Sequence, residues 1–291
     1  MPVQQDTDPR ARDRVGHDYR TLLVHVQPGL AGAHRVELAA GLARRFGARL
    51  VGLGAETYEP ISMLDPYSGQ LVAEMYQQLA RQVKADLANA ETAFRRDAAG
   101  ADLEWRVVDL TPVKALAQAA RAADLIVVTA DEGKSGDIYN TADPSEVILT
   151  AGRPVLVAPP GDGHLRADKI LVAWKDTREA RRAVADALPF LTRAEDVLVL
   201  AISGDEGAEA ARAAVEDVAE ALRRHGAPAR SAVTGAPDAS VADELNAEAA
   251  AMGADLIVAG AYGHSRTVEW VLGGATRALM RRPQRYLLLS H

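Results

Sequence analysis

The sequence predicts an α/β fold made of two tandem doubly wound domains, in which parallel strands lie between helices on both faces. The first observation is an internal repeat, because the apolar runs at 20–26 and 123–128 return in similar form at 168–174 and 254–259. The second is the rhythm inside each half, where short apolar runs alternate with Ala-rich segments of helical periodicity. This alternation is typical of βα units and of a parallel sheet.

The two copies of the repeat are separated by a segment rich in Pro, Gly and charge, residues 158–168. An exposed linker has this composition. We therefore expect a disordered polar tail at residues 1–17, a first domain at residues 18–160 and a second domain at residues 161–291.

The second half contains five predicted strands. They are the apolar runs within residues 168–174, 196–202, 229–233, 254–259 and 286–290. Continuous apolar runs are typical of strands buried on both faces. The first helix is predicted to begin with a capping box, in which Asp176 accepts from free N–H groups and Glu179 reaches back. Two later helices are predicted to end at Gly226 and Gly253.

The first half carries an insertion between residues 55 and 94. It begins with a turn-rich loop and continues as a long predicted helix with apolar residues near one face: Leu71, Met75, Leu79, Val83, Leu87 and Ala90. A helix with this pattern is expected to cover the core of its domain. A surface for a partner protein is the alternative.

Composition and charge limit the possible classes of function. The net charge of −7 argues against general binding to nucleic acid. The chain has no cysteine, which excludes thiol chemistry, and its histidines show no metal-ligand spacing, so no metal site is predicted. No apolar run is long enough for a membrane span, and the polar N-terminus lacks a signal-peptide core. We therefore expect a cytoplasmic protein that binds no membrane.

The strongest candidate for a binding site is the segment GAYGHSRTVEWVLGGATRALM. It places Gly260 and Gly263 directly after an apolar run, and Gly273 and Gly274 before a predicted helix. Ligands of doubly wound folds bind beyond the carboxyl ends of the strands. Glycine lets the backbone approach a ligand there, and the free N–H groups of a helix N-terminus attract phosphate. The segment therefore indicates a phosphate site.

Neighbouring residues support this interpretation without deciding it. Ala275 follows the last glycine at the start of the helix, and His264, Arg266 and Arg277 can add positive charge. No oriented base or oxyanion site accompanies His264 and its neighbour Ser265, so a hydrolase is not predicted. The alternative is that the glycines only turn the chain and allow close packing.

These residues resemble the universal stress protein family. Its nucleotide-binding members carry Gly, two residues, Gly, nine residues, Gly and then Ser or Thr, and Gly260, Gly263 and Gly273 match that spacing. The runs GADLIVAGAYGHS and VLGGATRALMRR are also similar to this family. The resemblance covers nearly the whole chain after the tail. It implies a five-stranded parallel sheet in each half and pairing of the two halves through their last strands.

Two residues depart from the pattern of the family. Gly274 stands where the family has Ser or Thr, so its N–H remains but the hydroxyl is missing. Lys175 stands where nucleotide-binding members place an Asp near the ribose and adenine, and it can instead reach a phosphate. The resemblance also implies that the backbone of Ile202 lies against adenine and that Ala259 lines the same pocket. Trp174 can stack on a base or close the domain interface.

The first half departs further from the family. Thr129 and Glu132 stand at the first pair of glycines, and Thr141 and Ala142 at the second. The same loop adds four carboxylates, those of Asp131, Glu132, Asp137 and Asp143. Because carboxylates repel phosphate, we predict that the first half does not bind ATP in the manner of the family.

The sequence thus predicts a regulatory or protective stress-response protein whose second half binds ATP or a related adenine nucleotide, with Mg²⁺ only as the companion of the nucleotide. No general base is apparent beside the glycine segment, so hydrolysis is expected to be slow and binding to act as a switch. The alternative is a nucleotide-free module of the same fold that acts through interaction or dimerisation. We also expect a homodimer and a regulatory protein partner.

Overall fold

The computed structural model describes residues 18–27, 32–58, 69–130, 137–161, 164–204, 207–235, 240–261, 274–281 and 283–291. The predicted tail at residues 1–17 lies outside the described residues. In the first half the strands and helices are β1 (Thr21–His25), α2 (Ala33–Phe46), β2 (Arg49–Ala55), α3 (Gly69–Asp97), β3 (Asp102–Val108), α4 (Pro112–Ala119), β4 (Leu125–Thr129), α5 (Pro144–Ala151) and β5 (Val155–Ala158).

The second half repeats this arrangement. Its elements are β6 (Lys169–Ala173), α6 (Arg178–Asp186), α7 (Leu188–Leu191), β7 (Asp196–Ile202), α8 (Ala208–Arg224), β8 (Ala229–Thr234), α9 (Val241–Met252), β9 (Leu256–Gly260), α10 (Gly274–Arg281) and β10 (Tyr286–Ser290). All five strands predicted for this half are present.

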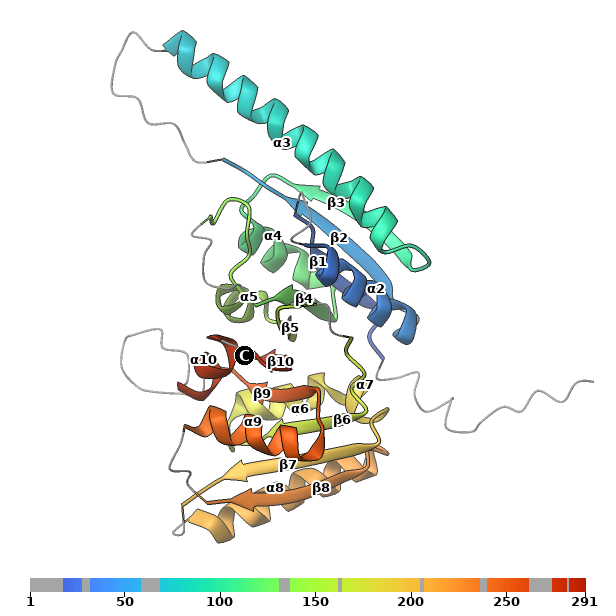
Figure 1. Cartoon of the computed structure of the whole chain (residues 1–291), viewed down its shortest axis with the longest axis vertical. Coiled ribbons are helices and arrows are strands. Elements are labelled where there is room, and N and C mark those ends of the chain that lie inside the picture. The colour runs from blue at the N-terminus through green and yellow to red at the C-terminus, as the bar shows by residue number, and fades with distance from the viewer. Residues whose placement is uncertain are drawn as a thin grey trace, which may run out of the picture.

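The strands form one ten-stranded sheet in the order β3-β2-β1-β4-β5-β10-β9-β6-β7-β8. Neighbours within each half are parallel, whereas β5 and β10 pair antiparallel, with Leu288 opposite Leu156. Figure 1 shows the two halves stacked end to end with β5 and β10 at the junction. The predicted α/β class and the predicted pairing through the last strands are therefore confirmed.

Each face of the sheet has its own apolar core. Residues of α2, α3, α6 and α8 pack on one face, and residues of α4, α5, α9 and α10 pack on the other. The strands at the junction are buried on both faces, as their continuous apolar sequences indicated.

The joint between the halves is further held by side chains. The rings of Tyr19, Phe46 and Phe190 meet edge to face, with centroids 5.1–5.7 Å apart. Beside them Arg193 forms an ion pair with Asp18 at 2.6 Å, and both side chains are largely buried. These contacts join α2 to α7 and so fix the two halves against each other.

The predicted capping box at the start of α6 is wrong. The N-cap residue is Thr177, whose hydroxyl accepts from the N–H of Ala180 at 3.3 Å. Asp176 lies one residue too early to cap, and its carboxylate pairs instead with Arg181 at 2.5 Å. The two helix ends predicted at glycines are confirmed, since both residues have the positive φ that favours glycine: Gly226 at +84° and Gly253 at +72°.

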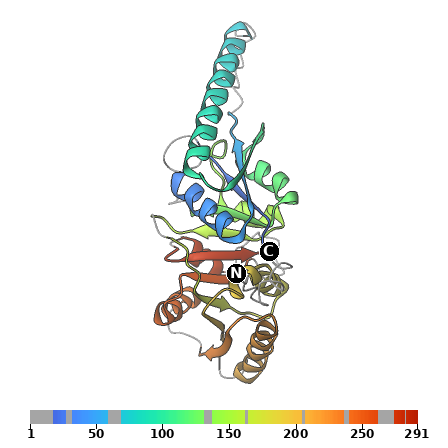
Figure 2. The same cartoon turned by 90° about the vertical axis from the view of Figure 1, so that its right-hand side faces the viewer.

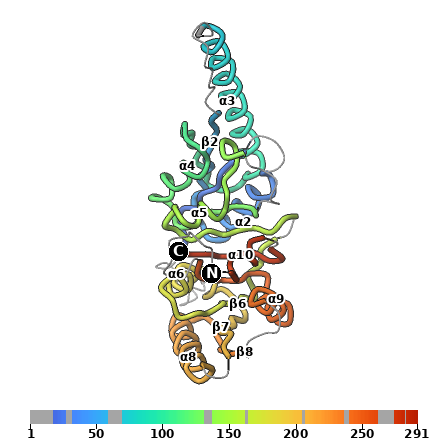
Figure 3. The backbone as a smooth tube through the Cα atoms, turned by 90° about the vertical axis from the view of Figure 1, so that its left-hand side faces the viewer, coloured from blue at the N-terminus to red at the C-terminus, as the bar shows by residue number. Residues whose placement is uncertain are grey.

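The long helix α3 covers the core with only part of its length. Toward its C-terminus Leu87, Ala90 and Phe94 are buried against the sheet. Toward its N-terminus Leu71 and Met75 are 54% and 36% exposed. Figures 1, 2 and 3 show this end of α3 running past the body of the first half. The predicted covering role is thus correct for the C-terminal part and wrong for the N-terminal part, because the sheet ends beneath it.

Candidate functional site

A cavity of about 650 Å³ opens at the carboxyl edge of the second half. It lies over the ends of β6, β7 and β9, and β6 pairs with β7 on one side and with β9 on the other. The chain order reverses at this point, which is where ligands bind in doubly wound sheets. The cavity therefore occupies the place that the sequence predicted for a site.

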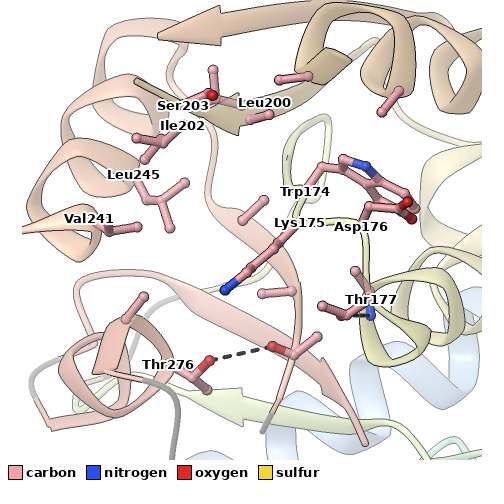
Figure 4. Close-up of a pocket in the computed structure, with 18 of the residues that line it drawn as sticks. Trp174, Lys175, Asp176, Thr177, Leu200, Ile202, Ser203, Val241, Leu245 and Thr276 are labelled. Atoms are coloured by element: carbon pink, nitrogen blue, oxygen red, sulfur yellow. Dashed lines mark hydrogen bonds between the residues drawn. The ribbon is translucent and has the colours of Figure 1, made fainter. Parts of the chain in front are cut away.

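Most of the cavity wall is apolar. Leu200 and Ile202 belong to β7, of which Ile202 is the last residue, and Val241 and Leu245 belong to α9. Figure 4 shows Ile202, Val241 and Leu245 grouped on one side of the space. Alanines of β6, α6, α8 and β9 complete the lining with short side chains. This wall suits a flat, weakly polar group such as a base.

Polar groups gather on another side of the cavity. The exposed side chain of Lys175 extends into the space toward α10, as Figure 4 shows. Among the described residues it has no ion-pair partner, because Asp176 beside it is paired with Arg181. The hydroxyl of Thr276, on α10, donates to the carbonyl oxygen of Gly260 at 3.4 Å. The ammonium group of Lys175 is therefore free to meet an anion.

Gly260 is required by packing. It is the last residue of β9, and a Cβ added there would lie 2.5 Å from the backbone nitrogen of Ala180 and 2.7 Å from the carbonyl carbon of Glu179. The first turn of α6 therefore approaches β9 closely only because this residue has no side chain. Glu179 itself is fully buried in that turn. Burial raises the pKa of its carboxyl, but hydrogen bonds from Arg178, its own N–H and Thr177 outweigh burial and hold the pKa below its ordinary value.

Gly274, unlike Gly260, is not required by packing. It is the first residue of α10 and lines the cavity together with Ala275. Among the described residues, an added Cβ would meet nothing within 4 Å, and the φ of Gly274 is outside the left-handed region. Neither packing nor backbone conformation therefore explains a glycine here. Its N–H and that of Ala275 belong to the first turn of a helix, where N–H groups lack partners within the helix.

The structure brings most of the sequence-predicted site residues into one cavity. Seven of them line it: Trp174, Lys175, Ile202, Ala259, Gly260, Gly274 and Ala275. The other three, Gly263, His264 and Gly273, lie outside the described residues. Trp174 is 9% exposed and belongs to the apolar core, and Figure 4 shows its ring leaving β6 in a different direction from Lys175.

Sequence reasoning did not assign several lining residues to the site, among them Thr276, Val241 and Leu245. Thr276 was passed over because the family motif ends two residues earlier, although it is the hydroxyl nearest to the start of α10. Val241 and Leu245 were assigned to a helix without a role. Val241 is an apolar residue at the first position of α9 and is 41% exposed, and its exposure is visible only in the structure.

The equivalent place in the first half is filled by Arg35 of α2. Its guanidinium is buried and donates to the carbonyl oxygen of His25 at 3.0 Å, to the hydroxyl of Thr129 at 3.0 Å and to the side-chain oxygen of Gln27 at 3.3 Å. It thus bridges the ends of β1 and β4. Burial lowers the pKa of Arg35 to about 10. No carboxylate among the described residues pairs with it.

His25 lies beneath this arginine at the end of β1. Its ring is 1% exposed, and Nε2 donates to the carbonyl oxygen of Ala55 at 3.0 Å. Burial, together with the charge of Arg35, lowers the pKa of His25 to about 3, against the opposing effect of the Ala55 hydrogen bond. The imidazole is therefore neutral at physiological pH.

No protein-family model and no curated protein matches this chain. Among solved structures, a universal stress protein from Archaeoglobus fulgidus DSM 4304 is similar, with a TM-score of 0.63 at 17% identity, over 93% of this chain and 97% of that chain. A putative universal stress protein from Pseudomonas aeruginosa UCBPP-PA14 has a TM-score of 0.53 at 16% identity, over 96% and 94% of the two chains. A functionally unknown protein from Pseudomonas aeruginosa PAO1 gives 0.53 at 15% identity, over the same shares of the two chains.

These similarities define the class of fold. Over nearly its whole length the chain has the fold of these universal stress proteins. Within the described residues, no helix combines the length and apolar character needed to cross a membrane. Nor do the described residues gather three or more His, Asp or Glu side chains that could hold a metal ion.

Proposed function

We propose that this chain is a stress-response protein that binds ATP or a related adenine nucleotide in its second half. The observation that carries the proposal is the cavity itself, which combines an apolar wall, an unpaired ammonium group and the first turn of a helix at the point where chain order reverses. Ligands of doubly wound folds bind at this point.

The chemistry of the cavity supports a nucleotide with its base and its phosphates at opposite sides. The base is expected against Ile202, Val241 and Leu245, where the wall is apolar. The phosphates are expected between Lys175 and the N–H groups at the start of α10, because both attract negative charge. Mg²⁺ would enter only with the nucleotide.

Binding rather than turnover is the proposed activity. Asp176 is the only carboxylate among the described residues of the cavity wall, and Arg181 holds it in an ion pair. A general base within reach of an attacking water is therefore missing from the described lining, so hydrolysis is expected to be slow. Nucleotide would act by shifting a conformational equilibrium.

The assembly and location of the protein are also proposed. The outer strand β8 has one unpaired side among the described residues, which supports a homodimer. The proposed location is the cytoplasm, and a regulatory protein partner would read the nucleotide state.

Calorimetry with ATP tests the proposal. We expect one site per chain in the wild type, and loss of binding in Gly274→Asp, which places a carboxylate where the phosphates should lie. Gly41→Asp is the matched control, since a Cβ at Gly41 also meets nothing within 4 Å but lies on α2 in the first half. Lys175→Gln should weaken binding by about tenfold, as expected for one lost charge contact. Absence of binding at millimolar ATP would leave the nucleotide-free interaction module as the function.

A further inference from the structure

A second hollow, of about 430 Å³, lies in the first half between α3 and the end of β3. We call it the α3–β3 groove. Its floor is formed by Val83 and Leu87 of α3 and by Trp105 and Val107 of β3, with Tyr58 at one end. It belongs to the opposite half of the chain from the nucleotide cavity, and the nucleotide proposal makes no use of it.

The floor of the groove is apolar and contains an aromatic contact. The Trp105 ring packs on the buried ring of Phe94 with centroids 5.6 Å apart. Val107, on the outermost strand of the sheet, is 57% exposed. An exposed valine beside an aromatic floor is typical of a surface that another molecule covers.

The apolar surface continues from the groove along α3. Tyr76 of α3 contacts Tyr58, with ring centroids 5.6 Å apart, and beyond it lie the exposed side chains of Met75 and Leu71. Between Gly69 and Ala80 this helix carries only one charged residue, Glu74. Helices that face only water usually carry more charge than this. The surface is thus elongated, which favours an extended partner over a small molecule.

The rim of the groove is acidic. Glu56 and Asp109 line it without an ion-pair partner among the described residues, while Glu91 is paired with Arg95 at 2.7 Å. One carboxylate oxygen of Glu56, Oε2, is buried and has no hydrogen-bond partner. Lys84 is the only cation in the described lining.

Two further carboxylates lie near Glu56. Burial, and then the nearby carboxylates of Asp86 and Asp137, raise the pKa of Glu56 above its ordinary value. The carboxylates of Asp86 and Asp137 thus add to the negative charge of Glu56 and Asp109. These four carboxylates stand against the single positive charge of Lys84. A cation that entered the groove would relieve this repulsion and give Glu56 its missing partner.

We propose that the α3–β3 groove docks a basic, apolar segment of a partner protein. Its apolar side chains would cover Trp105, Val107 and the exposed end of α3, and a Lys or Arg would pair with Glu56 and Asp109. The charge of the rim is the argument for this occupant: a second copy of this acidic surface would meet like charge, whereas a basic segment meets its complement.

A fluorescently labelled amphipathic peptide of leucine and lysine, titrated with the full chain, tests the proposal by anisotropy. A peptide in which glutamate replaces every lysine shows whether charge decides the binding. The test variant is Glu56→Gln with Asp109→Asn, which removes both unpaired charges and keeps the side-chain shapes. The control variant is Glu37→Gln with Asp217→Asn, two exposed carboxylates of α2 and α8 outside the groove. A further variant, Val107→Gln, changes the apolar floor at an exposed position.

We expect the lysine peptide to bind the wild type and the control variant equally, and the charge variant about tenfold more weakly. Val107→Gln should also weaken binding, and the glutamate peptide should bind none of them. Equal affinity of the lysine peptide for the charge variant and the control variant would overturn the proposal. So would binding of both peptides with similar affinity, since the groove would then be a general apolar surface. Matching thermal unfolding curves would show that all the variants fold.

Discussion

The two halves of this protein share one topology and differ at the same place in the sheet. In the second half, the carboxyl ends of β6 and β9 border an open cavity. In the first half, the ends of β1 and β4 are bridged by the buried guanidinium of Arg35. The comparison shows that the same place in the topology is open in one half and is bridged by one long side chain of the first helix in the other.

The last residue of the fourth strand differs between the halves, and this difference accounts for the open cavity in one half and the side-chain bridge in the other. Gly260 ends β9 and lets α6 approach so closely that an added Cβ would collide with it. Thr129 ends β4 at the equivalent place, and its hydroxyl accepts a hydrogen bond from Arg35. The repeat has therefore kept its strands and helices while it exchanged a close backbone contact for a side-chain bridge.

The largest expected effect comes from Gly260→Ala. The new methyl group would lie 2.5 Å from the backbone nitrogen of Ala180, so α6 must move away from β9. We expect the free energy of unfolding to fall by about 3 kcal/mol, as for other overpacked cores. Urea denaturation followed by circular dichroism measures this change.

Gly274→Ala is the matched substitution, because its methyl group would meet nothing within 4 Å. At the start of a helix it should leave the free energy of unfolding within about 0.5 kcal/mol of the wild type. If both variants lost similar stability, the distinction drawn between a packing glycine and a ligand-facing glycine would be wrong.

The second prediction concerns acid, and it separates the halves because β6 ends in Ala173 where β1 ends in His25. The pKa of His25 is lowered from 6.5 to about 3 in the folded chain. Between pH 6.5 and about 3, His25 is therefore protonated in the unfolded chain but neutral in the folded chain. The stability that neutral His25 provides is complete above pH 6.5 and is lost as the pH falls toward about 3. At about pH 4.5 the loss should be roughly 2 to 3 kcal/mol.

His25→Gln checks this assignment, because an amide can still donate to the carbonyl oxygen of Ala55 but does not titrate in this range. Urea midpoints of the variant and the wild type should be compared at several pH values between about 7 and 4.5. We expect the wild type to lose stability more steeply than the variant. Parallel curves would show that His25 is not the group responsible.

Much of this architecture was predictable from sequence, and the limits have physical causes. Alternating apolar runs and Ala-rich helices predict βα units. The run at 155–158 is apolar throughout, and the run at 286–290 has three consecutive leucines, because both strands are buried at the junction. The start of α6 was misplaced because Asp176 and Thr177 are both good capping residues, and only the backbone conformation at Thr177 selects between them. The exposed end of α3 was missed because a helical pattern does not report where the sheet beneath it ends.

The candidate site was predictable in part for similar reasons. The resemblance to the universal stress protein family implied Lys175, Ile202 and Ala259. All three lie at or next to strand ends, and parallel strands bring their carboxyl ends to one edge. Arg35 could not be predicted as the residue that fills the first half. It lies inside a helix, and its direction toward β1 and β4 depends on how that helix packs.

The smallest expected effect restores a feature of the nucleotide-binding pattern that the second half lacks. Gly274→Ser adds a hydroxyl at the start of α10, in space that contains nothing within 4 Å, so the fold should accept it without strain. At present the only hydroxyl that α10 contributes to the described cavity wall is Thr276, and it already donates to the carbonyl oxygen of Gly260. The new hydroxyl is free to donate to a phosphate, which should tighten ATP binding by about threefold to tenfold, the value of one added hydrogen bond. Calorimetry on Gly274→Ser and Gly274→Ala separates the hydroxyl from the added bulk. If serine and alanine changed the affinity alike, the phosphates would not lie at the start of α10, and the difference between the halves would need another explanation than ligand binding at this turn.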